Sequence, residues 1–133
     1  MRRIAASLLL ALIVALMGST VTASAQTRTF LFHMNTNYAH GKKPNYGYPA
    51  TKADNEQRAY VTVTSYTATA GSPTISMYVG NPTAQVSTAW SWRGTGSHTL
   101  DYTISGVGKG STFCLCAEQF GAGSVVLSGR WTP

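Results

Sequence analysis

Apolar and polar residues alternate most regularly over residues 58–66, in the stretch RAYVTVTSY. β-Branched and aromatic side chains dominate this stretch, and no glycine or proline interrupts it, which is typical of a β-strand. We therefore expect a central strand of an antiparallel sheet, with the rest of the chain supplying its neighbours. One face of this strand would carry Val61, Val63 and Ser65, and the other Tyr60, Thr62, Thr64 and Tyr66.

Shorter alternating runs continue through the rest of the chain, separated by glycine, proline and asparagine. About seven strands and no amphipathic helix after residue 25 predict an all-β protein, an antiparallel β-sandwich with a small barrel as the second choice. The core should contain Val61, Val63, Ile75, Leu100 and Ile104. The runs outside 58–66 cover residues 27–34, 74–79, 85–92, 98–104, 111–118 and 124–131.

Two of these runs predict a hairpin. Residues 85–92 and 98–104 flank the short turn RGTGS at 93–97, and glycine-containing turns of this length commonly join paired antiparallel strands. Trp90 and Trp92 lie in the first run, and their spacing places both indoles on one strand face. They form an alternative binding surface if exposed, whereas burial in the core is the more common position of tryptophan in a small domain.

The first 25 residues have the three regions of a secretory signal peptide. Arg2 and Arg3 give the basic start, residues 4–17 are nearly all apolar, and Ala23, Ser24 and Ala25 form a small-residue cleavage site. The apolar run is shorter than the roughly 20 residues that span a bilayer, so a transmembrane anchor is the less favoured alternative. We expect a secreted, extracellular protein with no stable membrane insertion after cleavage.

Residues 26–133 would then form the mature protein, which has the size of one domain. Cleavage lowers the formal net charge from +6 to +4, because eight Lys and Arg then face four Asp and Glu. A mild positive charge favours approach to an anionic cell-envelope polymer or glycan. Nucleic acid is not an expected partner, because the basic residues are scattered apart from Lys42 and Lys43.

Residues 35–57 differ in composition from the predicted strands. They are rich in Asn, Gly, Pro and Lys and have almost no aliphatic residue, which predicts a long loop. Long loops in compact domains are usually functional or mobile. Tyrosine suits contacts with sugars or proteins, and the alternative is that the tyrosines fold back over the sheet. The candidate binding residues are Tyr38, His40, Lys42, Lys43, Tyr46 and Tyr48.

Cys114 and Cys116 are the only two cysteines, one residue apart in FCLCAEQF. On a strand their side chains share a face with Cα atoms about 6.5–7 Å apart, at or beyond the usual bridging range. Two small, buried thiols are the favoured interpretation, and a strained bridge is the alternative. A metal site or an intermolecular bridge is less favoured, because zinc takes about four ligands and its cysteine pairs are typically C-x2-C.

The motifs that indicate catalysis are missing from the sequence. A glycosidase needs two carboxylates at a set separation, and the sequence does not place its few acids in such a pair. It has no G-x-S-x-G elbow, H-E-x-x-H motif or C-x-x-C motif. These features predict a protein that is not an enzyme, with no metal site and no cofactor. The acids after residue 25 are Asp54, Glu56, Asp101 and Glu118.

Three short motifs are R-A-Y-V-T-V-T at 58–64, T-F-C-L-C-A at 112–117 after a glycine joint, and S-G-R-W-T-P at 128–133. Through them the chain resembles small exported β-sandwich proteins of Gram-positive bacteria whose function is not established. N-Y-A-H-G at 37–41, followed by a strand, is similar to exported bacteriocins of the lactococcin type. The first resemblance implies an antiparallel β-sandwich, and neither one assigns a functional residue.

Export, mild positive charge and the tyrosine- and lysine-rich loop together favour a secreted binding protein, bacteriocin-like or otherwise directed at a bacterial cell envelope. A structural or self-assembling extracellular protein is the main alternative, because exposed strand edges and the cysteine pair could serve assembly. A small glycan-binding module is a further alternative that rests on surface tyrosines and tryptophans.

Overall fold

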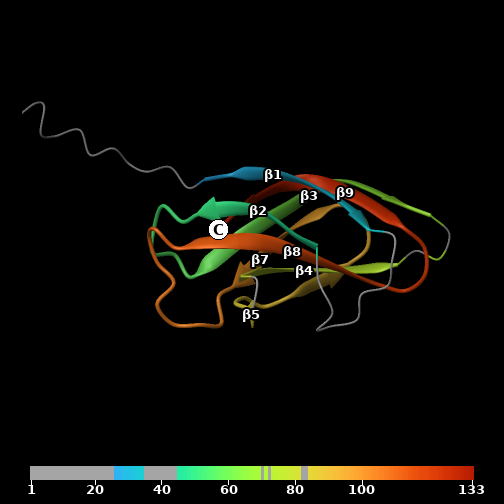
Figure 1. Ribbon diagram of the computed structural model, residues 1–133. Helices are drawn as coiled ribbons and strands as arrows, with labels where there is room; N and C mark the ends of the chain where they lie inside the picture. The colour runs from blue at the N-terminus through green and yellow to red at the C-terminus, as the bar shows by residue number, and fades with distance from the viewer. Residues whose placement is uncertain (1–25, 35–44, 70, 72, 82–83) are drawn as a thin grey trace, which may run out of the picture.

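The computed structural model describes residues 26–34, 45–69, 71, 73–81 and 84–133, and within these ranges it contains nine β-strands and no helix. The strands form two antiparallel sheets that share one core (Figure 1). The predicted all-β sandwich is confirmed, since the sheets of the described ranges do not close into a barrel. The predicted signal peptide lies outside the described residues. The strands are β1 (Arg28–Met34), β2 (Asn45–Thr51), β3 (Arg58–Ala68), β4 (Thr74–Asn81), β5 (Ala84–Gln85), β6 (Trp90–Trp92), β7 (Gly96–Asp101), β8 (Thr112–Phe120) and β9 (Val125–Thr132).

Sheet A has the strand order β1-β9-β3-β7, and sheet B has the order β2-β8-β4, with β5 and β6 both paired to β4. β9 is the shared partner in sheet A, because β1 and β3 each pair with it and not with each other. Figure 1 shows β1, β9 and β3 running along one side of the molecule and β8 and β4 along the other. β3 therefore has the central position that its alternation predicts.

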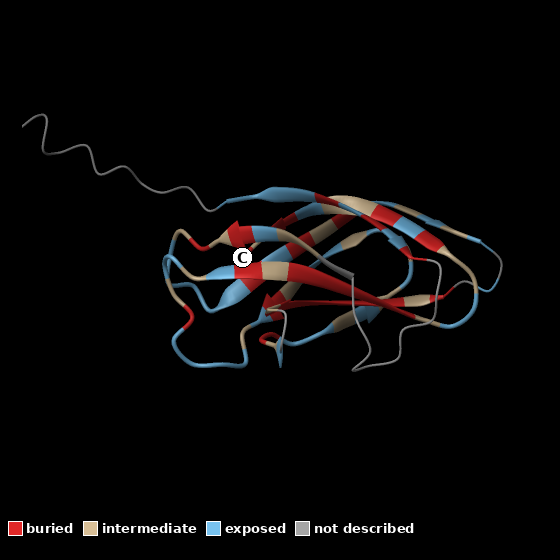
Figure 2. Cartoon of the chain, viewed as in Figure 1, coloured by how far each residue is buried: buried red, intermediate tan, exposed pale blue. Residues whose placement is uncertain are grey.

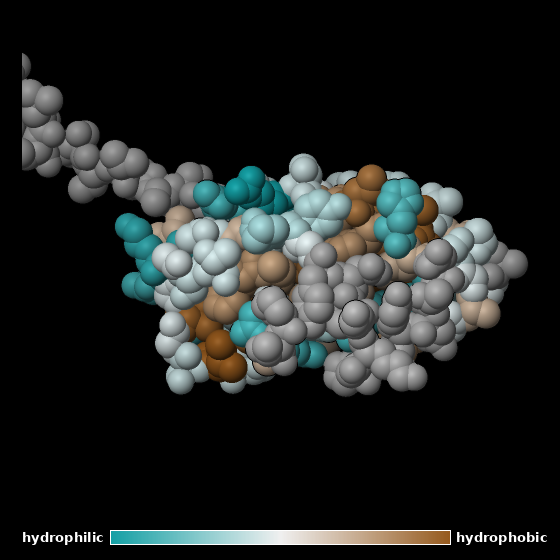
Figure 3. Space-filling model, in the orientation of Figure 1, coloured by the Kyte–Doolittle hydropathy of each residue, from teal (hydrophilic) through white to brown (hydrophobic). Residues whose placement is uncertain are grey.

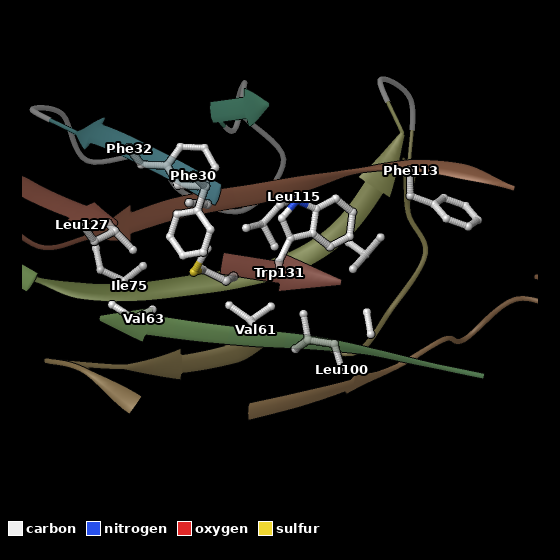
Figure 4. Packing of buried hydrophobic residues seen from close by; sticks show 14 of the residues in the cluster. Phe30, Phe32, Val61, Val63, Ile75, Leu100, Phe113, Leu115, Leu127 and Trp131 are labelled. Atoms are coloured by element: carbon white, nitrogen blue, oxygen red, sulfur yellow. The ribbon is translucent and has the colours of Figure 1, made fainter. Parts of the chain in front are cut away.

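The core lies between the two sheets. Val61 and Val63 of β3, Ile75 of β4 and Leu100 of β7 are at most 2% exposed, so these four core predictions are confirmed. Figure 4 shows their side chains together with Trp131 of β9, drawn from both sheets into one cluster. Burial of each such aliphatic side chain contributes about 1.5–3 kcal/mol. β8 is buried along most of its length, whereas β1 and β9 alternate between buried and exposed positions (Figure 2).

A bulge interrupts the pairing of β3 with β9. The register shifts between Val63 and Ser65, and one extra residue reverses the side-chain alternation beyond it. Tyr66 then lies opposite Leu127 and packs against the core, whereas Ser65 is exposed. The predicted faces of Ser65 and Tyr66 are therefore wrong, because strict alternation was assumed along the whole strand.

β2 occupies seven residues of the segment 35–57, so the loop prediction is wrong for residues 45–51. β2 is an edge strand of sheet B, and its register against β8 shifts between Gly47 and Ala50. Pro49, which has no N–H to donate, lies in this interruption of the ladder. A stretch rich in Asn, Gly and Pro can form an edge strand because an edge does not need a continuous ladder on both sides.

The predicted hairpin over residues 85–104 forms only at the end away from its turn, where an antiparallel bridge joins Ser87 to Tyr102. β6 pairs with β4 in sheet B and β7 pairs with β3 in sheet A, so the turn between them carries the chain from one sheet to the other. Gly94 in this turn has a φ of 95°, which is a conformation that favours glycine. β7 ends at Asp101, and Ile104 is 43% exposed. Ile104 is therefore not in the core, because the strand ends before reaching it.

Hydrogen bonds join the loop after β2 to the loop before β8 at one end of the sandwich. Lys52 donates its backbone N–H to the carbonyl of Ser111 over 2.9 Å, and Lys109 donates its backbone N–H to Oδ1 of Asn55 over 2.9 Å. Val107, in the loop before β8, is buried. These contacts hold the loop after β2 against the loop before β8.

Candidate functional site

Three rings from Trp92, Trp90 and His98 form a stack, which we call the aromatic row. The centroids of the two indoles are 3.7 Å apart with an angle of 1° between their planes. The His98 imidazole lies on the other side of Trp90, with centroids 4.8 Å apart and planes 16° apart. Trp90 is thus covered on both ring faces, and the outward faces of the row belong to Trp92 and His98.

The two sheets position the row from opposite sides. Trp92 lies opposite Ile75 in the pairing of β6 with β4, and His98 lies opposite Val61 in the pairing of β7 with β3. Ile75 and Val61 face the core, and directly opposed residues of paired strands share a face. The row therefore stands where the interior of the sandwich meets solvent, at the edge bounded by β6 and β7.

Local contacts fix the orientation of the indoles. The indole N–H of Trp92 donates a 2.8 Å hydrogen bond to the carbonyl of Gly94. The Trp90 ring lies over Gly96 of β7, where an added Cβ would be in ordinary contact with it at 3.5 Å. Both indoles are half-buried and pack against the core, whereas His98 is exposed. Trp90 and Trp92 thus combine the two predicted alternatives: one side packs on the core, and part of each ring reaches the surface.

His98 was not identified from the sequence as part of a site. The sequence feature that could have indicated its position is the alternation in HTLDYTI, which places His98 on the same strand face as Leu100, a core residue. The contact with Trp90 depends on β6 and β7 lying in different sheets, and this long-range relationship has no local signature.

Tyr48 is held by both sheets. Its φ is 57°, the only positive φ at a non-glycine residue in the described part of the chain. Its hydroxyl donates to the carbonyl of Leu31, and its own carbonyl accepts the indole N–H of Trp131 over 2.9 Å. Its ring meets Phe32 edge-on, with centroids 5.3 Å apart. This arrangement corresponds to the alternative in which the tyrosine folds back over the sheet.

For the other residues of the predicted loop site the structure describes no side chain. The backbone of Tyr46 lies in β2, opposite Cys116, and its side chain is not described. The predicted contact surface therefore stays a prediction. The remaining candidates, Tyr38, His40, Lys42 and Lys43, lie outside the described residues.

Cys114 and Cys116 are both free thiols on β8. Cys116 is buried and Cys114 is half-buried. Burial, together with the neighbouring Cys114 and Glu118, raises the pKa of the Cys116 thiol from 9.0 to about 12. Cys116 therefore stays protonated at neutral pH and is a poor nucleophile.

The four acidic side chains of the described ranges each contact a different residue. Asp54 lies 3.6 Å from the buried ammonium of Lys52, and Asp101 lies 3.5 Å from Arg58. The remaining two accept hydrogen bonds from tyrosine hydroxyls: Glu56 from Tyr60, and Glu118 from Tyr78 over 2.8 Å. Across the part of the chain that the structure describes, no three His, Cys, Asp or Glu side chains group together as metal ligands.

No family model, curated protein or solved structure matches this chain. The resemblance to small exported proteins thus stays an expectation from the sequence. Among the described residues, no helix is long and apolar enough to cross a membrane.

Proposed function

We propose that the protein is a secreted, non-enzymatic binding protein of the cell envelope that holds a glycan against the Trp92 end of the aromatic row. The observation that carries this proposal is the fixed order Trp92–Trp90–His98 at the sandwich edge. A sugar presents an apolar C–H face and polar edges, which match an aromatic ring with polar surroundings. The proposal joins the envelope-binding and glycan-binding hypotheses from the sequence.

The row is already in the conformation that a sugar would need. Stacking on Trp90 and the hydrogen bond to Gly94 hold the Trp92 ring in one orientation. A rigid aromatic surface binds with less loss of conformational freedom than a mobile one. On the face seen in Figure 3, strongly apolar atoms gather in separate places rather than in one broad patch.

Self-assembly is the alternative function, and two features of the strand edges disfavour it. The Tyr48 hydroxyl occupies the carbonyl of Leu31 on the edge strand β1 of sheet A. The bulge at Pro49 interrupts the edge strand β2 of sheet B. At these two edges, both features block the regular hydrogen bonding that edge-to-edge pairing between chains requires.

Titration of the purified protein with cell-wall polysaccharides and neutral oligosaccharides tests the proposal, with tryptophan fluorescence as the readout. Trp92→Ala should weaken binding about two- to tenfold, corresponding to about 0.5–1.5 kcal/mol for one aromatic contact. Tyr60→Ala is the matched control, because Tyr60 is an exposed aromatic residue on sheet A, away from the row. Undiminished binding by a folded Trp92→Ala variant would contradict the proposal and would favour the segment 35–44.

A further inference from the structure

We infer that the free edge of β7 pairs with the same edge of a second copy of the chain, forming a closed two-fold dimer. Such pairing goes beyond the proposed function, because it uses the backbone of β7 and not the rings of the aromatic row. Three features support it: the direction of the backbone groups of β7, the lack of protection at this edge and the symmetry of the free residues.

β7 pairs with β3 on one side, and the chain uses only part of its other side. At Asp101 the backbone carbonyl accepts the N–H of Thr88 over 2.8 Å, and the backbone N–H donates to Oγ1 of Thr88 over 3.0 Å. The backbone groups of Asp101 therefore point away from β3. Alternate residues of a strand direct their N–H and C=O to the same side, so those of Ser97 and Thr99 also point away from β3.

The segment 86–88 begins to pair with the end of β7 and then leaves it. An antiparallel bridge joins this segment to Tyr102, but after Thr88 the chain continues to β6 in sheet B. Among the described residues, the backbone groups of Ser97 and Thr99 have no hydrogen-bond partner on this side. Ser97 is exposed and Thr99 is half-buried, so another extended backbone can reach both.

Among the strand edges that the structure describes, β7 forms the one without protection against pairing. Edge strands are commonly protected by charged side chains, proline, bulges or short length. β1 and β2 are blocked by Tyr48 and by the bulge at Pro49, and the edge of β5 and β6 is divided into strands of two and three residues. From Gly96 to Leu100, β7 has no proline, lysine, arginine or acid, and no bulge interrupts its pairing with β3. Pairing at one edge joins two chains and then stops.

The free residues of β7 are symmetric about His98. A two-fold axis beside His98 places Ser97 of each chain opposite Thr99 of the other, in antiparallel register. Both residues direct their backbone groups outward, so each pair can exchange both N–H···O bonds. A register centred elsewhere would pair one of them with Asp101, which Thr88 already contacts, or with the turn before β7. A second copy of the chain therefore matches this edge in length and in the positions of its donors and acceptors.

The dimer would leave the proposed glycan surface available. His98 would lie opposite its counterpart, whereas Trp92 is separated from His98 by Trp90 in the aromatic row. Two Trp92 surfaces would then belong to one rigid assembly. A polysaccharide long enough to reach both would bind more tightly through the higher effective concentration of the second surface.

Sedimentation equilibrium of the purified protein from about 10 µM to about 1 mM tests the inference. The average mass should rise from one chain toward two and no further, with a dissociation constant of about 10–500 µM, because so short an interface belongs to the small, transient class. Thr99→Pro should weaken association by about tenfold or more, since it removes an outward N–H and leaves the bonds to β3 in place. Thr99→Ala keeps this N–H and is the matched control, expected within about twofold of wild type.

Three double variants test the register, with thermal unfolding as the check on folding. Ser97→Lys with Thr99→Glu places opposite charges across both pairs and should associate at least as strongly as wild type. Ser97→Lys with Thr99→Lys, and Ser97→Glu with Thr99→Glu, place like charges there and should each associate about two- to tenfold more weakly. These two like-charged variants change the net charge in opposite directions, so a general effect of net charge would move them in opposite directions.

Four results would overturn the inference: a wild-type protein that stays monomeric at every concentration, assemblies larger than two chains, a folded Thr99→Pro variant that associates as wild type does, or like-charged variants that shift in opposite directions. A monomer that binds an extended peptide through Thr99 would assign the edge to another partner and would also refute the dimer. Glycan binding is a separate result, because Trp92→Ala can lose it and still dimerise.

Discussion

The indole N–H of Trp131 donates a 2.9 Å hydrogen bond to the backbone carbonyl of Tyr48. Trp131 lies on β9 in sheet A and Tyr48 lies on β2 in sheet B, so this bond joins the two sheets across the core. The Tyr48 hydroxyl makes a second connection, to Leu31 of β1. The unusual φ of 57° at Tyr48 is thus supported by contacts on both sides of the residue.

Three substitutions at Tyr48 separate these contributions. Tyr48→Phe removes only the hydroxyl bond and should lower the free energy of unfolding by about 0.5–1.5 kcal/mol. Tyr48→Ala also removes the ring from Phe30 and Phe32 and should cost about 2–4 kcal/mol. Tyr48→Gly loses the same contacts but relieves the positive φ, so it should be about 1 kcal/mol more stable than Tyr48→Ala. Denaturant unfolding measures all three, and an alanine variant more stable than the glycine variant would refute the strain argument.

Gly129 should not tolerate a side chain. A Cβ at this position would overlap the carbonyl oxygen of Thr62 and lie 2.8 Å from the Phe30 ring. Backbone cannot move aside as a flexible side chain can, so Gly129→Ala should destabilise the protein by about 3 kcal/mol or prevent folding. Gly47→Ala is the control, because the nearest atom to its added Cβ would be 3.8 Å away. A stability change below about 0.5 kcal/mol is expected there, and similar losses at both glycines would contradict the argument.

The buried ammonium of Lys52 predicts an asymmetry between two substitutions. Its nitrogen has no hydrogen-bond partner in the described ranges, and it lies 3.6 Å from Asp54 and 5.0 Å from the centroid of the Tyr102 ring. Lys52→Met keeps the packing and removes the buried charge, so its stability should lie within about 1 kcal/mol of wild type or above it. Asp54→Asn leaves the ammonium without its counter-ion and should cost about 1–3 kcal/mol. Thermal and denaturant unfolding compare the two, and a larger loss in Lys52→Met would contradict this account.

The thiol of Cys116 predicts a loss of stability in alkali. Burial raises its folded-state pKa from 9.0 to about 12, so above pH 9 the unfolded thiol ionises while the folded thiol keeps its proton. The stability linked to this proton is present below pH 9 and is lost as the pH rises toward 12, by at most about 1.4 kcal/mol per pH unit. Burial also raises the pKa of Tyr102 above 10.0, which adds a loss in the same direction at higher pH.

Unfolding measurements between pH 8 and about 9 favour the thiol, because a tyrosine with the ordinary pKa of 10.0 is still mostly protonated in the unfolded chain there. Cys116→Ala should reduce the slope of stability against pH there, and Cys114→Ala should retain most of it. A thiol reagent at pH 8 should leave Cys116 unlabelled in the folded protein and react with two equivalents after denaturation without reductant. Labelling that requires reductant would show a bridge in place of free thiols.

The alternation of apolar and polar residues predicts those features of the fold that depend on a single strand. β1 and β3 follow from their side-chain pattern, and Phe30, Val61 and Val63 are buried as that pattern requires. The pattern fails at the β3 bulge, where Ser65 and Tyr66 exchange faces. The extra residue lies between the pairs Val63–Gly129 and Ser65–Ser128 and exists only in the pairing with β9, so the sequence of β3 alone does not predict it.

In the candidate site too, contacts within one strand follow from the sequence, whereas contacts between strands do not. Trp90 and Trp92 follow from their spacing on one strand, and their stacking needs only β6. The contact of Trp90 with His98 joins strands of different sheets. It depends on which sheet each strand enters, and the turn between β6 and β7 had the composition of an ordinary hairpin turn.

The position of β9 has a consequence for the order in which the chain can fold. β1 has β9 as its sheet neighbour, and β3 reaches β1 only through β9. A chain that emerges with its N-terminus first, from a ribosome or from an export channel, cannot complete sheet A until its last strand is free. Because closing contacts between such distant segments is slow, sheet A should be completed only after the whole chain has been released.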